Sequence, residues 1–232
     1  MSATALTDAP PSPAPLTLGG RLLNIFICPS EVFDEVVAAP QCGTNWRVPT
    51  LLVCLMGIIL RQAIVTQGEH GDAFGTLIRS GGLTAVQAQE LLGVWPLISS
   101  IAICLSAFAG ILWSAFVLWF IGRVFLRTKF AFEKALEVVG LASTILVLGA
   151  VITILLIAAT GDLHARPALS LLGHVSHVKA HAILETIDFF QIWSTSVLAV
   201  GLSRLSGVSF KESAFWVFGY WVFARLALIL LV

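Results

Sequence analysis

The chain has 232 residues, of which 58% are hydrophobic and only 11% are charged, and its formal net charge is +0. Ordinary soluble domains carry about 25% charged residues, so this composition excludes a water-soluble globular protein and indicates a protein solvated by lipid. The balanced charge gives no basis for binding nucleic acid or an acidic substrate.

The amino-terminal end differs from the rest of the chain. Proline, alanine and serine dominate residues 1–17, without a basic start followed by an apolar core. This composition is typical of a disordered tail and unlike a signal peptide. We therefore expect a disordered tail over residues 1–17 and one membrane domain over residues 18–232.

A short amphipathic helix is predicted ahead of the membrane segments. Ser30 is placed to cap it, and Glu31 lies in its first turn, where the positive end of a helix favours an acidic residue. Pro40 ends the helix. The predicted apolar face comprises Val32, Phe33, Val36 and Val37, and the opposite face comprises Glu31, Asp34 and Glu35. We expect this helix at the membrane surface or against the bundle, with its acidic face favouring contact with a protein over anionic lipid.

Five apolar segments follow. They run from about Val48 to Thr66, Trp95 to Phe125, Ala135 to Ala159, Ile183 to Leu202 and Ala214 to Val232. Crossing a bilayer takes about 20 apolar residues in a helix. Because backbone groups in lipid must be satisfied internally, unbroken apolar runs predict helices. The predicted fold class is therefore all-α, an integral membrane bundle of five transmembrane helices preceded by the short amphipathic helix.

Basic residues predict the orientation of these segments. Eight lie on the side of the amino terminus and three on the other side. The eight are Arg21, Arg47, Arg123, Arg127, Lys129, Lys134, Arg204 and Lys211, and the three are Arg79, Arg166 and Lys179. The excess of basic residues on cytoplasmic loops predicts a cytoplasmic amino terminus and a carboxyl terminus on the outside.

The second apolar segment carries two local signals. Thr84 and Gln87 have the spacing of a capping box, which predicts a short helix through Leu92 ahead of the segment. Within it, Ser106, Gly110 and Ser114 fall on one helix face. Small residues in this spacing permit close helix approach, inside the protein or between two copies of it.

Two arginines lie inside predicted spans, where an ionisable side chain is costly unless it pairs or reaches the interface. Arg61 is a few residues from the outer end of the first span, and its long side chain can extend to that interface. Arg225 has apolar residues on both sides. We expect Arg225 to face the bundle interior and to pair with Asp188 or Glu185, either as a salt bridge between helices or in an ion or proton pathway.

Three histidines and two carboxylates lie in the stretch Gly173–Asp188, before and at the start of the fourth span. His174, His177, His181, Glu185 and Asp188 would lie within about 80° of one another on a helix. This stripe is interpreted as a solvated or interhelical polar face, as a divalent metal site, or as a pH sensor. The chain has no HExxH pattern, which disfavours a zinc protease.

Enzyme signatures are otherwise absent from the sequence. It contains no GxSxG elbow, no P-loop and no Rossmann glycine pattern. We therefore expect a protein that is not an enzyme and carries no cofactor.

Several short motifs occur in an order similar to that of a known family. The entry to the membrane region has Ile25 and Phe26 ahead of Pro29–Phe33, and Trp46–Pro49 follows. Later come Phe130–Gly140, the trio Phe190, Ile192 and Trp193, the pair Gly201 and Leu202, and the Ser203–Ser213 loop. Over roughly residues 20–230 the chain resembles the Yip (Ypt-interacting protein) domain family.

The resemblance implies a five-helix membrane domain with a cytoplasmic amino terminus and no catalytic residues. Eukaryotic members are linked to small Ypt/Rab GTPases and vesicle traffic, so a GTPase partner is implied by family analogy alone. The short proline-rich tail is similar to prokaryotic members, which implies a prokaryotic plasma membrane. We expect an adaptor or organiser that contacts lipid and other membrane proteins or itself. The alternative is a small transporter or channel subunit that uses Arg225, Asp188 and the stripe of His174, His177 and His181.

Overall fold

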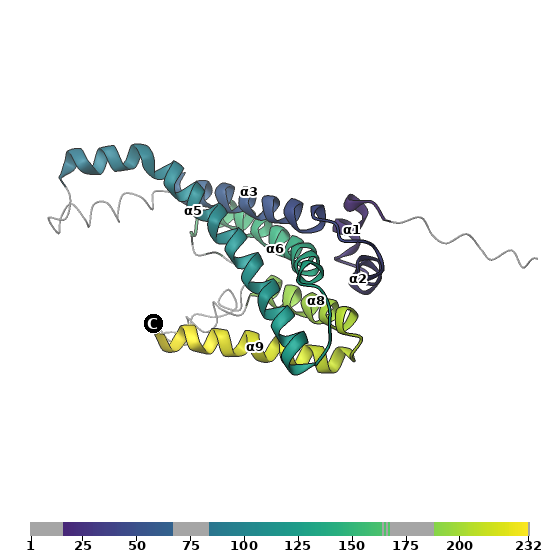
Figure 1. Ribbon diagram of the computed structural model, residues 1–232. Helices are drawn as coiled ribbons and strands as arrows, with labels where there is room; N and C mark the ends of the chain where they lie inside the picture. Colours follow the sequence, from purple (N-terminus) through teal and green to yellow (C-terminus); the bar gives the residue numbers. More distant parts are fainter. Residues whose placement is uncertain (1–15, 67–83, 164, 166, 168–187, 232) are drawn as a thin grey trace, which may run out of the picture.

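A computed structural model describes residues 16–66, 84–163, 165, 167 and 188–231. The described residues form helices and no β-strand, which confirms the all-α class (Figure 1). The helices are α1 (Leu18–Asn24), α2 (Pro29–Ala38), α3 (Thr44–Thr66), α5 (Ala85–Phe120), the π-helical turn η1 (Ile121–Phe125), α6 (Phe132–Thr160), α8 (Phe189–Ser206) and α9 (Phe210–Leu231).

Three of the described helices are long and apolar enough to cross a membrane. They are Thr44–Val65 of α3, Gly93–Phe125 of α5 and η1, and Phe132–Thr160 of α6. The described parts of the fourth and fifth predicted segments lie in α8 and α9, which are not among these three. Five spans therefore stay a prediction.

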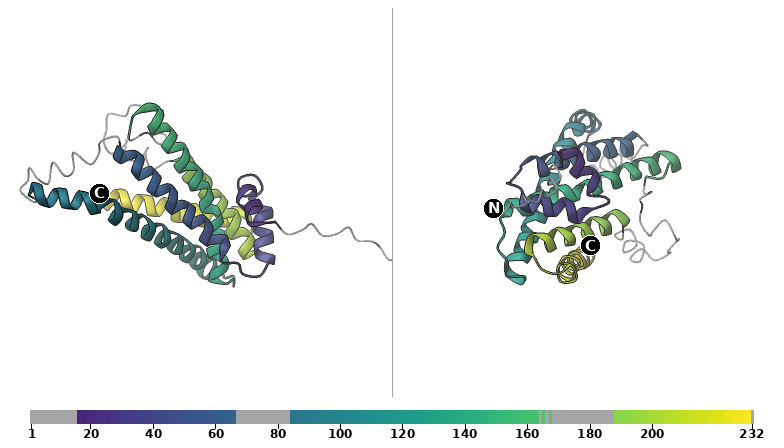
Figure 2. Two further views of the ribbon diagram at one scale, coloured as in Figure 1. Left: turned by 90° about the horizontal axis from the view of Figure 1, so that it is seen from above. Right: turned by 90° about the vertical axis from the view of Figure 1, so that its right-hand side faces the viewer.

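Helix α6 lies at the centre of the bundle. It packs against α3, α5 and α8, while α9 packs on the outer side of α8 (Figures 1 and 2). Helices α1 and α2 lie across one end, against α6 and α8. At this end α3, α6 and α9 begin and α5 and α8 finish, so consecutive long helices run in opposite directions.

The amphipathic helix α2 lies against the bundle, one of the two predicted positions. Val32, Phe33 and Val36 are fully buried, whereas Val37, predicted on the same face, is exposed. The N-cap residue is Cys28 and not the predicted Ser30, because Pro29 already occupies the first helical position. Proline suits that position, since its missing N–H would have no partner within the helix.

The capping box before the second segment is confirmed, but the helix it starts is longer than predicted. The Thr84 side chain accepts from the Gln87 N–H, and Gln87 bonds back to Thr84. The helix then continues as α5 without a break, so residues 85–92 are its first turns and not a separate helix. At 1.5 Å per residue, the 36 residues of α5 extend beyond the roughly 30 Å apolar core of a bilayer.

Close packing between helices depends on glycines of α6 and α8. A side chain at Gly140 would meet the backbone of Trp46 in α3, and one at Gly201 would meet Val138. The predicted small-residue face of α5 behaves differently. Gly110 has open space around it, and Ser106, Gly110 and Ser114 line a half-open cavity of about 250 Å³. This face therefore does not bring two helices into close contact within the chain.

Candidate functional site

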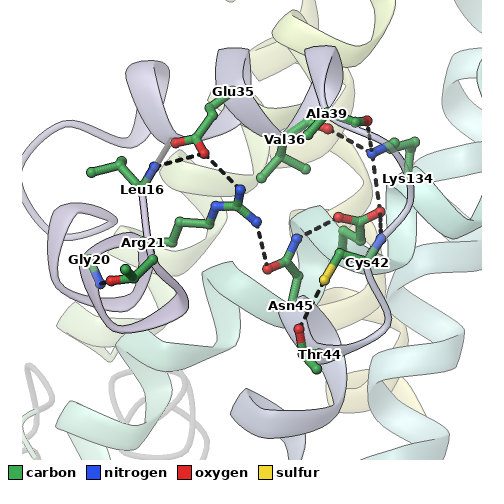
Figure 3. A network of polar contacts seen from close by, with 12 residues as sticks. Leu16, Gly20, Arg21, Glu35, Val36, Ala39, Cys42, Thr44, Asn45 and Lys134 are labelled. Atoms are coloured by element: carbon green, nitrogen blue, oxygen red, sulfur yellow. Dashed lines mark hydrogen bonds and ion pairs between the residues drawn. The ribbon is translucent and has the colours of Figure 1, made fainter. Parts of the chain in front are cut away.

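A network of charged and amide side chains connects the amino-terminal helices to the bundle (Figure 3). Arg21 of α1 lies between Glu35 of α2 and Asn45 of α3. One guanidinium nitrogen of Arg21 is 2.7 Å from Glu35 Oε1, and the other donates to Asn45 Oδ1 at 3.1 Å. A single side chain thus joins three helices.

The same network continues into α6 through Glu137. Its Oε2 accepts from Asn45 Nδ2 at 2.6 Å, and its Oε1 accepts from the Cys42 N–H at 3.1 Å. Lys134, one turn earlier in α6, has its Nζ 3.2 Å from Glu137 Oε1. Glu137 is only 2% exposed. A carboxylate this buried requires charged and hydrogen-bonding partners, and here it has both.

Lys134 also binds the carboxyl-terminal end of α2. Its Nζ donates to the carbonyls of Val36 and Ala39 at 2.7 and 2.9 Å. These carbonyls lie at the negative end of the α2 dipole, where a cation is stabilising. The two cations, Arg21 and Lys134, balance the two carboxylates, Glu35 and Glu137, so the network has no net charge.

A second, exposed contact joins α2 to α8. Arg204 Nε is 3.5 Å from Asp34 Oδ1, and these side chains are 44% and 56% exposed. Such a pair contributes little stability. It does place the carboxyl-terminal end of α8 beside α2, at the same end of the bundle as the network.

Sequence reasoning did not single out Glu137 or Asn45. The available signal was a glutamate inside an apolar segment, two residues past the predicted start of the third span at Ala135. An ionisable residue in such a position marks a partner or a function. Asn45 and Cys42, which both donate to Glu137, lie 92 and 95 residues earlier in the chain, so no local pattern identifies them.

Arg225 was predicted to pair with Asp188 or Glu185; Glu185 lies outside the described residues, and the structure gives Arg225 other contacts than Asp188. Its guanidinium donates to Gln191 Oε1 at 3.1 Å and lies over the Trp221 ring at 5.6 Å. Asp188 is the N-cap of α8, and its carboxylate accepts from the Phe190 N–H at 2.7 Å. The carboxylate is therefore used at the helix start, and Gln191 is one turn further in.

The predicted polar stripe does not continue as a helix through Asp188. The backbone of Asp188 is extended, with φ −88° and ψ 131°, and α8 begins at the following residue. His174, His177, His181 and Glu185 lie outside the described residues, so the metal and pH-sensing interpretations stay predictions. Within the described part of the chain, no three His, Cys, Asp or Glu side chains are placed to hold a metal ion. Arg61 lies half-buried in α3, and its predicted extension to the interface stays a prediction.

An aromatic groove that sequence reasoning also missed lies between α5 and α9. Its volume is about 460 Å³. The Trp113 indole N–H donates to the Tyr220 hydroxyl across it at 2.8 Å, and Phe125 stacks on Trp216 with ring centroids 4.1 Å apart. The available signal was the recurrence of aromatic residues at helical spacing in two segments that are 90 or more residues apart.

Comparison with known proteins gives one match. A family model for the Yip1 domain matches residues 23–232. No curated protein and no solved structure matches the chain. The family match extends from α1 to the end of α9 and agrees with the apolar helices described above. The chain therefore belongs to the Yip1 domain family and is an integral membrane protein.

Proposed function

We propose that the protein is a non-enzymatic adaptor or organiser of other membrane proteins. It crosses a prokaryotic plasma membrane five times, with its amino terminus in the cytoplasm and its carboxyl terminus outside. The observation that carries the proposal is the largely buried network of Arg21, Glu35, Asn45, Lys134 and Glu137. This network fixes α1 and α2 at the end of the bundle where α3, α6 and α9 begin. Membership of a family that is not an enzyme family supports the same conclusion.

The segment of α1, α2 and the turn between them carries large apolar side chains on its outer surface. Leu23 is 70% exposed and Ile27 is 80% exposed. Side chains of this kind on an immobilised element favour contact with another protein. The nearby Glu31 and Asp34 repel anionic lipid headgroups, so the same surface is a poor membrane anchor.

The alternative of a transporter or channel subunit has no observation in its favour. Arg225 contacts the neutral side chain of Gln191 and not the carboxylate of Asp188. The histidines that would complete a polar pathway lie outside the described residues.

The experiment is photocrosslinking in cells at native expression, with a photoreactive amino acid in place of Ile27. The matched control carries it in place of Val86, which is 68% exposed near the start of α5, at the far end of the bundle (Figure 1). We expect one recurrent membrane-protein adduct from position 27 and not from position 86. Adducts with lipid alone at position 27, or the same adducts from both positions, would contradict an adaptor surface on the segment of α1, α2 and the turn between them.

A further inference from the structure

The groove between α5 and α9 has an almost wholly apolar wall. Trp113, Phe116 and Phe120 contribute from α5, and Trp216 and Phe223 contribute from α9. The polar atoms of Trp113 and Tyr220 are hydrogen-bonded to each other. The wall therefore offers aromatic faces to an apolar chain and few polar groups to a soluble ligand.

Several exposed basic residues lie near one end of this groove. It is the end at which η1 leads into the loop to α6 and at which α9 begins (Figure 1). Arg123, Arg127 and Lys129 are exposed in this connection, and Lys211 is exposed in the first turn of α9. Two exposed carboxylates, Glu133 and Glu212, leave an excess of two positive charges there. Arg123 lies over the Trp119 ring at 5.6 Å.

The backbone at this end departs from a regular helix. Residues 121–125 form the π-helical turn η1, and such turns are frequent at functional sites. Arg127 has φ 55°, in the left-handed region that residues other than glycine rarely adopt. Phe125, in the π turn, stacks on Trp216, and both rings line the groove near the basic residues.

We propose that the groove binds an anionic phospholipid. An acyl chain lies along the aromatic wall, and the phosphate headgroup lies against Arg123, Arg127 and Lys129. Basic pockets between membrane helices on the cytoplasmic side bind anionic headgroups in this way. Basic residues on this side also follow from membrane orientation, so the charges alone do not make a site. The site is formed by these basic residues together with the apolar groove that ends beside them.

Charge complementarity favours a lipid over a second protein chain. A transmembrane helix of a partner or of another copy would fill the apolar groove, but it would leave the excess positive charge at its end unbalanced. An anionic phospholipid satisfies the aromatic wall and the basic end together.

The test measures lipid retained by the full-length protein, by native mass spectrometry after exchange into detergent with equal amounts of phosphatidylglycerol and phosphatidylcholine. We expect several-fold more phosphatidylglycerol than phosphatidylcholine on the wild type. The Arg123→Gln/Arg127→Gln/Lys129→Gln variant is expected to lose this preference. A control with Arg47→Gln and Arg204→Gln, which removes exposed charges at the same end but away from the groove, should keep it.

A second variant tests the groove independently of charge. A side chain at Gly219, which lines the groove, would meet no atom within 4 Å at its Cβ, so Gly219→Leu fills the groove without a backbone clash. It should retain several-fold less of either lipid, whereas Gly93→Leu, another glycine with open space around it, should retain the wild-type amount. Equal retention of both lipids by the wild type would overturn the proposal. So would a dimer that Gly219→Leu dissociates, because a second copy would then occupy the groove.

Discussion

At the scale of single residues, Glu137 is the group on which the amino-terminal assembly depends. It accepts from Asn45 and Cys42 and lies beside Lys134, so both carboxylate oxygens are used. Replacing a buried ion pair by apolar residues is often harmless, whereas removing one partner leaves the other charge uncompensated. The network is therefore sensitive to loss of the glutamate charge even where its net contribution to stability is small.

The substitution Glu137→Gln tests this sensitivity. It keeps the size of the side chain but leaves Lys134 without its counter-charge. It also replaces the carboxylate that accepts from the Cys42 N–H by a neutral amide group. We expect the free energy of unfolding to fall by about 3 kcal/mol, the lower end for breaking a buried pair. Thermal unfolding of the purified protein in detergent measures it. Glu133→Gln, an exposed residue one turn earlier, should leave the melting temperature unchanged, and equal effects of both would contradict the network's role.

Cys42 offers a second test at this scale. The Thr44 hydroxyl, 3.0 Å from its sulfur, lowers the pKa of the Cys42 thiol below its ordinary value by hydrogen-bonding to the thiolate. Because the thiolate is the reactive form, alkylation of Cys42 should begin at a lower pH than for an ordinary cysteine. Thr44→Val should move its pH profile for iodoacetamide, followed by peptide mass spectrometry, to higher pH. Thr44→Ser, which keeps the hydroxyl, should not. A profile unchanged by Thr44→Val would rule out this hydrogen bond as the cause.

At the scale of elements, the close approach of α3 and α6 requires a glycine. A methyl group at Gly140 would collide with the backbone of Trp46, and a backbone atom cannot move aside as the end of a flexible side chain can. Gly140 lies one turn from Glu137, so separation of α3 from α6 would also lengthen the hydrogen bonds of Glu137 to Asn45 and Cys42.

We expect Gly140→Ala to destabilise the protein by about 1–3 kcal/mol, the usual cost of overpacking a well-packed core. Gly110→Ala is the matched control, because Gly110 lies in the middle of a membrane helix with open space at its Cβ position. It should be neutral or slightly stabilising. The melting temperature in detergent distinguishes the two variants, and an equal decrease in both would indicate a general intolerance of alanine rather than a specific contact.

Much of the element level could be predicted from the sequence. Apolar runs identified the long helices because a helix satisfies the hydrogen bonds of its own backbone in lipid. The capping box of Thr84 and Gln87 could be predicted because its two residues are only three positions apart. The network could not be predicted, because Arg21, Asn45 and Glu137 are far apart in the chain and meet only after α3 packs on α6. The structure places Asp188 at the N-cap of α8 and brings Arg225 to Gln191 instead, an outcome that no local pattern indicated, and the alternative partner Glu185 lies outside the described residues.

At the scale of the whole molecule, the direction of the helices bears on the number of membrane spans. The Arg204 and Asp34 contact and the packing of α2 on α8 place the turn between α8 and α9 at the same end as the amino-terminal helices. If α3, α5 and α6 alone crossed the membrane, that turn would have to lie on the opposite side of the membrane from the amino-terminal helices, which extend from the start of α3. Five spans remove this conflict.

Labelling with a membrane-impermeant maleimide separates five spans from three. With the proposed cytoplasmic amino terminus, both arrangements put the carboxyl terminus outside, so a terminal reporter does not distinguish them, whereas the turn between α8 and α9 changes side. In a cysteine-free background, we expect Ser209→Cys, an exposed position in this turn, to react only after the cells are permeabilised. Val86→Cys, at the far end, should react in intact cells. Reaction of Ser209→Cys in intact cells would leave three spans and would place Arg204 on the outside, on the opposite side of the membrane from Asp34 of α2, which it contacts in the structure.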